Sequence, residues 1–178
     1  MDQIKETVAK YQEYVIATRR HFHMNPETSG EEFATQQTIM EELSKIGLSP
    51  RKAAGTGVIA DIVGALPGKT VALRADIDAL PLQDEITQPY RSQVAGKCHA
   101  CGHDGHMAML LTMAKVFVDL QPVLPGNIRL LFQPTEEKFP GGAEAMIADG
   151  AMDGVDFVLG THVWQTLAAG VVGIAYGR

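Results

Sequence analysis

Apolar residues recur at two different spacings along this chain, and each spacing predicts a different kind of element. Between residues 3 and 24 the spacing is close to one helical turn, with apolar side chains at Ile4, Val8, Tyr11, Val15 and Phe22. A second helix is expected over about residues 30–47. Glu31 and Glu32 lie in its first turn, where the helix dipole favours acidic side chains, and Gly47 ends it.

After residue 50, short continuous apolar runs replace the helical period. Residues 57–63 and 70–75 predict two strands, separated by a glycine- and proline-containing turn over residues 64–68. The remaining expected elements are helices over residues 104–120 and 142–150 and strands over residues 127–132, 156–160 and 170–175. This alternation of strands and helices predicts an α/β fold, in which a mixed, largely buried sheet is flanked by helices.

Size, charge and cysteine content exclude several classes of function. With 178 residues the chain is expected to be one domain, and 15 basic against 21 acidic residues give a net charge of −6. It therefore offers no basic stripe for nucleic-acid phosphates and no cationic anchor for a membrane. No apolar run approaches the roughly 20 residues of a spanning helix, and the charged N-terminus is unlike a secretory signal. Because two cysteines cannot staple a fold of this size, we expect a cytoplasmic location.

Polar residues with metal-binding chemistry gather at the ends of predicted strands. Three groups follow a strand directly: Asp76 with Asp78, Glu136 with Glu137, and His162. Ligands of α/β sheets bind outside the carboxyl ends of strands, so these side chains are expected to converge on one crevice. A fourth group, residues 98–106, contains two cysteines and three histidines in a loop that leads into a helix. Thiolate, imidazole and carboxylate together are typical ligands of transition metals.

Each group also has a simpler explanation. Aspartates after a strand are often turn or cap residues, adjacent glutamates are often a solvated face, and a single histidine is often a surface residue. Cys98 and Cys101 have the spacing of a redox pair, although the usual strand-to-helix turn is not evident before them. A structural zinc knot built on these cysteines would need a second Cys or Cys/His pair at ligand spacing, which the sequence lacks. The coincidence of all groups at strand ends favours the metal site.

The residue types suggest how such a site would divide its work. Cys101 and His103 are one residue apart, so in an extended loop both side chains would reach the same side. Of two consecutive glutamates, Glu136 and Glu137, one is expected to bind metal and the other to carry protons. Asp78 and Asp104 are candidates for carboxylates that orient the ligating histidines.

At these residues the sequence resembles the aminoacylase/carboxypeptidase superfamily of di-metal hydrolases. Within it, the branch of hippurate hydrolase, N-acyl-amino-acid amidohydrolases and auxin-conjugate hydrolases is the most similar. The resemblance rests on residues 19–23 with 26–27, 74–81, His99-Ala100-Cys101-Gly102-His103-Asp104, Gln133-Pro134-Thr135-Glu136-Glu137, and 160–164. These motifs run in family order over nearly the whole chain. An aspartate at position 76 is typical of the hippurate-hydrolase branch.

The resemblance implies a role for each matching residue. The implied metal ligands are Cys101, His103, Glu137 and His162. Glu136 matches the general base, and Asp78 matches the aspartate that supports the metal site, whereas His21 and His23 belong to a structural helix. Two divalent cations are implied, with zinc, manganese, cobalt or nickel as candidates. The implied reaction is hydrolysis of the amide bond of an N-acyl amino acid or a similar small conjugate.

Family members are about twice as long as this chain. Residues 1–178 therefore match the N-terminal part of a zinc-peptidase-like catalytic domain, without the lid and dimerisation domain or the C-terminal catalytic segment. The full-length enzyme is expected to be a homo-oligomer, and the chain alone is expected to be a poor catalyst. The alternative is a truncated, catalytically inactive remnant that still binds metal.

Overall fold

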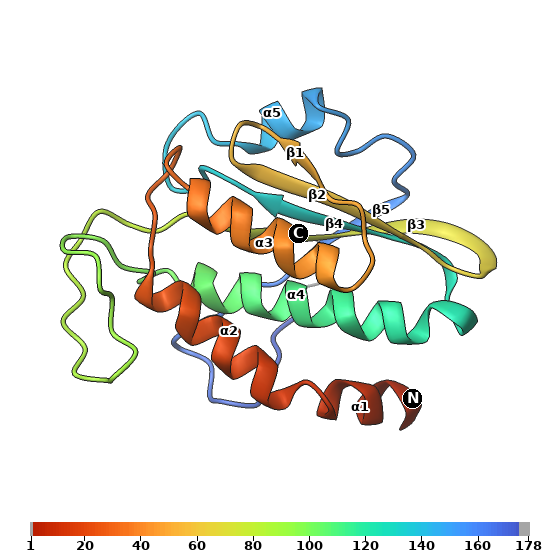
Figure 1. The fold of residues 1–178 in the computed structure, drawn as a ribbon, viewed down its shortest axis with the longest axis horizontal. Helices are drawn as coiled ribbons and strands as arrows, with labels where there is room; N and C mark the ends of the chain where they lie inside the picture. The colour runs from red at the N-terminus through yellow and green to blue at the C-terminus, as the bar shows by residue number, and fades with distance from the viewer. Residues whose placement is uncertain (1, 175–178) are drawn as a thin grey trace.

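The computed structural model describes residues 2–174, which form one five-stranded sheet with helices on both faces (Figure 1). The helices are α1 (Asp2–Ala9), α2 (Gln12–Met24), α3 (Phe33–Lys45), α4 (His103–Leu120) and α5 (Ala143–Ala148), with a short 3₁₀ turn at Gln121–Val123. The strands are β1 (Arg51–Ala53), β2 (Gly57–Val63), β3 (Leu66–Asp76), β4 (Pro125–Gln133) and β5 (Phe157–Gly160). The predicted α/β class, with a mixed sheet flanked by helices, is confirmed.

The strand order is β1-β2-β4-β3-β5, and the sheet changes direction within it. β1 pairs antiparallel with β2, and β2 pairs antiparallel with β4. β3 lies between β4 and β5 and is parallel to both, with Leu73 in register with Leu130 on one side and Leu159 on the other. As a result, β3, β4 and β5 all end at the same edge of the sheet.

The two faces of the sheet are covered to different depths (Figure 1). On one face α2, α3 and α4 enclose the main core, in which Phe22, Ile39, Leu111, Leu130 and Phe132 are each at most 1% exposed. On the other face α5 and the turn after it cover a smaller cluster, which includes Met146 and Leu131. Helix α4 lies in the middle of the larger layer, so its first turn is held rigidly beside the end of β3.

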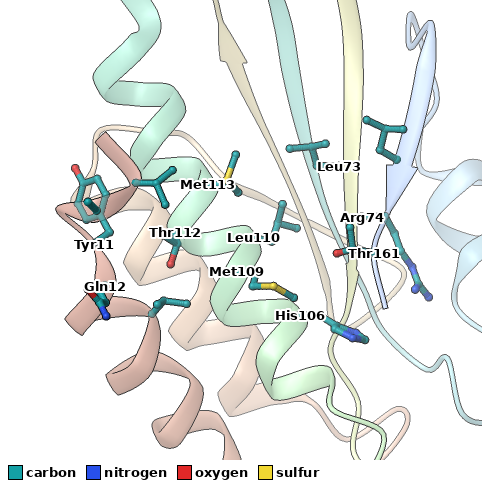
Figure 2. Close-up of a pocket in the computed structure, with 14 residues that line it drawn as sticks. Tyr11, Gln12, Leu73, Arg74, His106, Met109, Leu110, Thr112, Met113 and Thr161 are labelled. Carbon is teal, nitrogen blue, oxygen red and sulfur yellow. The ribbon is translucent and has the colours of Figure 1, made fainter. Parts of the chain in front are cut away.

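Strand β5 is packed much less well than the rest of the sheet. Phe157, Val158 and Leu159 are each about half exposed, so the expectation of a largely buried sheet holds for β2 and β4 but not for this edge. A cavity of about 630 Å³ also lies between α1, α2, α4 and the β3–β5 edge (Figure 2). Tyr11, Met109 and Thr161 are among the residues that line it.

Four expectations about single elements are wrong, and one strand was not expected. α3 begins at Phe33, so Glu31 and Glu32 precede its first turn, and β3 begins at Leu66, inside the expected turn over residues 64–68. The first predicted helix is two helices, because the chain turns at Lys10 and Tyr11. β1 was not expected, since its three residues include two charged ones. The strand predicted over 170–175 is absent from residues 170–174, where Val172 and Ile174 are 84% and 71% exposed. An apolar run becomes a strand only beside a partner strand, and none lies there; Ala175 is outside the described residues.

Within residues 2–174, no helix has both the length and the apolar character needed to span a bilayer.

Candidate metal centre

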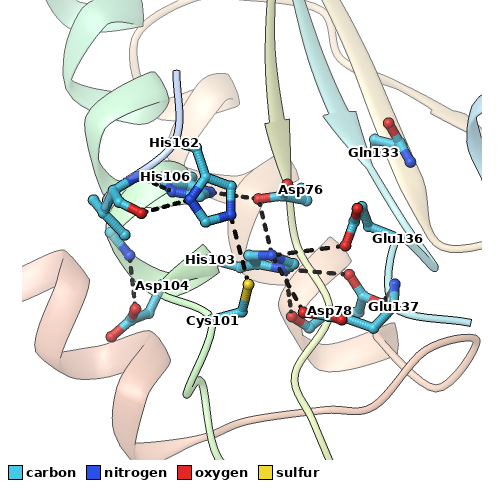
Figure 3. Close-up of polar contacts among 12 residues, drawn as sticks. Asp76, Asp78, Cys101, His103, Asp104, His106, Gln133, Glu136, Glu137 and His162 are labelled. Carbon is cyan, nitrogen blue, oxygen red and sulfur yellow. Dashed lines mark hydrogen bonds and ion pairs between the residues drawn. The ribbon is translucent and has the colours of Figure 1, made fainter. Parts of the chain in front are cut away.

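The candidate residues meet where β3, β4 and β5 end (Figure 3). Asp76 closes β3 in register with Gln133, the last residue of β4, and Asp78 follows two residues later. Glu136 and Glu137 come just after β4, and His162 comes just after β5. The side chains that follow the three strands therefore lie together at one edge of the sheet, as expected. His103, the first residue of α4, lies at the centre of the group.

The turn into α4 brings Cys101 and His103 together, although not in the expected way. The segment is not extended: Gly102 caps the helix in a left-handed conformation, with φ of +89°. A Cβ at this position would overlap the side chain of Val163. Glycine is therefore needed twice here, for the backbone angle and for the close approach of the segment that carries His162.

His103 is fully buried, and its hydrogen bonds leave one ring nitrogen free. Nδ1 donates to the carbonyl oxygen of Asp78 at 2.9 Å, so Nε2 carries the lone pair. Nε2 lies 3.6 Å from Glu137 Oε1, 3.9 Å from Glu136 Oε2 and 3.6 Å from Asp76 Oδ1. It makes no hydrogen bond to any of them. A histidine held by a carbonyl on one nitrogen and free on the other is the usual arrangement of a metal ligand.

Cys101 and His162 form the outer side of the group. Cys101 Sγ lies 3.5 Å from His162 Nε2, and His162 Nδ1 lies 2.5 Å from its neighbour's carbonyl, Val163 O. His162 therefore also presents Nε2, as His103 does. Donor atoms of Cys101, His103 and His162 all lie within 4.8 Å of one another, and so do donor atoms of His103, Glu136 and Glu137. The four predicted ligands and the predicted base thus share one small volume.

The two glutamates are placed by an unusual turn. Thr135 has φ of +53°, a left-handed conformation that is uncommon for a β-branched residue. Its N–H donates to Glu32 Oε1 at 2.9 Å, and Glu32 is completely buried. The Glu136 side chain is 41% exposed and that of Glu137 is 21% exposed. Glu137 is thus the more enclosed of the two, and Glu136 is the more open to solvent.

Asp78 ties the two sides of the site together. Its Oδ2 accepts hydrogen bonds from Ser29 Oγ at 2.6 Å and from the backbone N–H of Glu137 at 2.9 Å. Burial alone would raise the pKa of Asp78, but the adjacent His103 imidazole and the hydrogen bonds from Ser29 and the backbone outweigh burial and lower this pKa to about 2. Asp78 is therefore an ionised, fixed support rather than a proton carrier.

The donor set fits a bound cation. His103 Nε2, Asp78 Oδ1 and Glu137 Oε1 are buried without hydrogen-bond partners, which is costly unless a cation satisfies them. Burial, a hydrogen bond to Glu137 and nearby carboxylates raise the pKa of the Cys101 thiol to about 12. The excess of negative charge around these donors would stabilise a bound divalent cation. The S, N and O donors suit zinc or a similar ion.

Three residues that support the site, His106, Ser29 and Glu32, were not expected from the sequence. His106 lies one helical turn after His103; its Nδ1 is 2.6 Å from Asp76 Oδ1, and its Nε2 accepts from Val163 N at 3.0 Å. An ion pair with Arg74 at 2.5 Å holds Asp76 in place, and Asp76 in turn holds His106. The chain of contacts from Asp76 through His106 to Val163 N is called the relay below. Ser29 and Glu32 support the site from the loop before α3. Only the spacing of His103 and His106, three apart and so on one helix face, could have indicated any of these contacts.

Asp104 does not orient any of the histidines predicted to bind metal at this centre, so that expectation is wrong. Its Oδ2 lies 2.7 Å from His23 Nδ1 and 2.8 Å from Arg19 Nε, on the side of α4 away from the metal donors. Both cysteines are free thiols.

The fold and the donor cluster can now be compared with those of known proteins. Residues 72–177 match the sequence profile described as Peptidase family M20/M25/M40, and the chain belongs to that family. An N-acyl-L-amino acid amidohydrolase of Geobacillus stearothermophilus is 50% identical over 177 residues, which cover 99% of this chain and 48% of the relative. The IAA-amino acid hydrolase ILR1-like 6 of Arabidopsis thaliana is 44% identical, over 89% of this chain and 34% of the relative.

A solved structure has the same fold. The Bacillus subtilis YXEP protein, described as a dinuclear metal binding peptidase from the M20 family, superposes with a TM-score of 0.87 at 35% identity. The match covers 96% of this chain and 47% of that one. The chain thus spans about a third to a half of the length of these relatives.

Proposed function

We propose that this chain carries the metal-binding and proton-transferring part of an amidohydrolase that cleaves the amide bond of N-acyl amino acids or similar small conjugates. The observation that supports this most is the set of unpartnered donors around His103 Nε2. Family membership and the names of the relatives agree with amide hydrolysis. Domain limits, cytoplasmic location and oligomeric state stay predictions.

Two divalent cations, zinc, manganese, cobalt or nickel, are the cofactors that we assign to this site. Cys101, His103, Glu137 and His162 would hold them, with water completing the coordination. Bound cations at such a site polarise the substrate carbonyl and make a water molecule more acidic. The carboxylate and imidazole donors converge from three strands and one helix, so they are oriented before any ligand arrives.

Glu136 is the group that we assign to proton transfer. Its carboxylate reaches to 3.9 Å from His103 Nε2, yet its side chain is 41% exposed, so it adjoins both the metal donors and the solvent side where substrate enters. It would accept a proton from the attacking water and deliver it to the leaving amine. Glu137, which is more enclosed, and whose N–H is held by Asp78, remains a ligand.

The substrate class follows from the relatives and from a hollow beside the site. Both relatives above are named as hydrolases of amino-acid conjugates. A cavity of about 430 Å³ adjoins Cys101 and His162, and Trp164 and Gln165 line its outer part. An indole ring next to an amide side chain suits an acyl group with one polar end.

The test is hydrolysis of a panel of N-acetyl, N-benzoyl and indole-acetyl amino acids by the purified chain with saturating zinc or manganese. We expect slow release of free amino acid that a chelator abolishes and added metal restores. If the alternative, a metal-binding remnant, is correct, metal analysis will show bound cation while no substrate is cleaved. Failure to bind cation at all would contradict both interpretations.

A further inference from the structure

A second group of metal-type donors lies on the other side of α4, outside the site described above. It consists of His23 near the end of α2, Asp84 in the loop between β3 and α4, and Cys98 near the end of that loop. One donor atom from each lies within 4.8 Å of the other two. The three residues are 5%, 8% and 6% exposed, so the group is closed off from solvent.

His23 has the hydrogen bonding of a ligand histidine. Its Nδ1 lies 2.7 Å from Asp104 Oδ2, so in the neutral imidazole that donates to this carboxylate Nε2 carries the lone pair. Nε2 is buried and makes no hydrogen bond, although Asp84 Oδ2 is only 3.3 Å away. Metal-binding histidines usually donate their other nitrogen to a carboxylate in this way. The alternative is an ion pair between protonated His23 and Asp84, but the 3.3 Å contact lacks the geometry of a hydrogen bond.

The charged side chains around the group have a net negative charge, which favours a bound cation. Asp84 and Asp104 carry two negative charges in this buried region, and Arg19, 2.8 Å from Asp104, supplies one positive charge. A divalent cation with a Cys98 thiolate adds one further positive charge, which balances the group. Asp84 accepts two backbone N–H bonds, from Ile86 and Ser92, and a carboxylate retains further lone pairs for a metal.

The loop that contains Asp84 is anchored elsewhere by surface contacts, such as the cation–π contacts of Tyr90 with Arg19 and Arg20 and the ion pair of Lys97 with Glu31. Residues 81–97 form no helix or strand, and Asp84 is the only one of them that is buried. The loop is closed at its base by two backbone bonds between Leu80 and Cys98, and Gln93 N bonds to Met24 O on α2. Long loops without a core of their own are uncommon in compact domains unless something fixes them. A cation bound by the three donors would link α2 to both the start and the end of this loop.

We propose that His23, Asp84 and Cys98 form a second, structural metal site for a zinc-type divalent cation, which fastens residues 81–97 to α2. Sulfur, nitrogen and oxygen donors are the ligand types that zinc takes, and an enclosed water would complete the four-coordinate site. The site is separate from the hydrolytic centre, because His103 and Asp104 point to opposite sides of α4 (Figure 3). It does not rest on the proposed function, since its tests need no turnover.

Cobalt can report this site, because the chain has only two cysteines. In Cys101→Ser the sole thiol is Cys98, so any thiolate-to-cobalt absorption in the near ultraviolet must come from it. We expect Cys101→Ser to show this absorption on addition of Co²⁺, and Cys101→Ser/Cys98→Ala to lose it. Adding His23→Ala to Cys101→Ser should also abolish it, whereas adding His21→Ala, at an exposed position on the same helix, should not. Circular dichroism checks that each variant is folded.

Two results would overturn the proposal. One is no thiolate absorption in folded Cys101→Ser at saturating cobalt; the other is absorption that survives His23→Ala, which would mean that Cys98 had joined another centre. Limited trypsin digestion gives a second readout in the unmodified chain, at the exposed Arg91. At metal concentrations 100 times the dissociation constant, cleavage through loop opening should slow about 100-fold. Equal slowing in Cys98→Ala would also contradict the proposal.

Discussion

One side of the molecule, formed by β2, β4 and α4, is packed much better than the other side, formed by β5 and residues 161–174. The candidate metal centre takes residues from both sides. β2, β4 and α4 form a closed core, in which Leu130 and Phe132 are completely buried. β5 and residues 161–174 are exposed, beside a large cavity. His103, Glu136 and Glu137 come from the first side, and His162 comes from the second. The centre thus has a rigid half and a weakly supported half, and each half can be tested separately.

The largest effect is expected from the two glutamates of the rigid half. Glu136→Gln should keep metal and lose roughly 10²–10⁴-fold in turnover, because it removes a proton carrier but no ligand. Glu137→Gln should instead lower the metal content, since its buried Oε1 has no other partner. Metal analysis by mass spectrometry, together with the hydrolysis assay, separates the two roles. The reverse pattern would show that the roles are exchanged.

The second effect compares the two sides directly by stability. Leu130→Ala removes a fully buried side chain and should lower the free energy of unfolding by about 2–5 kcal/mol. Leu159→Ala, on the neighbouring edge strand and 59% exposed, should change it by about 0.5 kcal/mol or less. Urea denaturation of both variants measures the difference. Similar losses would mean that β5 is packed in solution against something that covers it, and the contrast drawn here would fail.

The third effect is a pH dependence that originates in the rigid half. The pKa of Asp78 is about 2 in the folded chain against 3.8 for an ordinary aspartate, so its ionised form stabilises the fold. This contribution, about 2 kcal/mol, is fully present above pH of about 4 and disappears as the pH falls towards 2. Denaturation in chelator at several pH values measures it. Asp78→Asn should flatten that part of the profile; an unchanged slope would mean that other carboxylates dominate.

Sequence periodicity predicted the rigid half well and the exposed half poorly, for a physical reason. α4 and β4 have long apolar runs that the core itself selects, so their positions follow from pattern. The apolar run after Gly170 has no partner strand, and nothing in its own residues reveals that. The convergence of Cys101 and His103 was expected for the wrong reason, since Gly102 turns the chain. Ser29, Glu32 and His106 act through contacts distant in sequence, which pattern cannot supply.

The smallest effect concerns the relay that joins the two halves. His106 takes a hydrogen bond from Val163 N and is held by Asp76, so it positions His162 without being one of the proposed ligands. His106→Phe keeps a ring of similar size in α4 but removes the acceptor for Val163 N. We expect metal affinity to fall about 10–100-fold, the usual effect of losing a group that orients a ligand. Titration with a metal-competing dye measures it.

The control for this relay must separate positioning from general damage to the fold. His21→Phe makes the same change at an exposed histidine on α2, and should leave metal affinity and stability unchanged. His106→Gln restores a hydrogen-bond acceptor near the former Nε2, so it should recover part of the affinity if positioning is the cause. The Val163 N–H to His106 Nε2 bond is one of the contacts that join the weakly supported half to α4. If His106→Phe binds metal as tightly as the unmodified chain, His162 is either positioned by its own segment or is not a ligand, and the rigid half alone holds the cations.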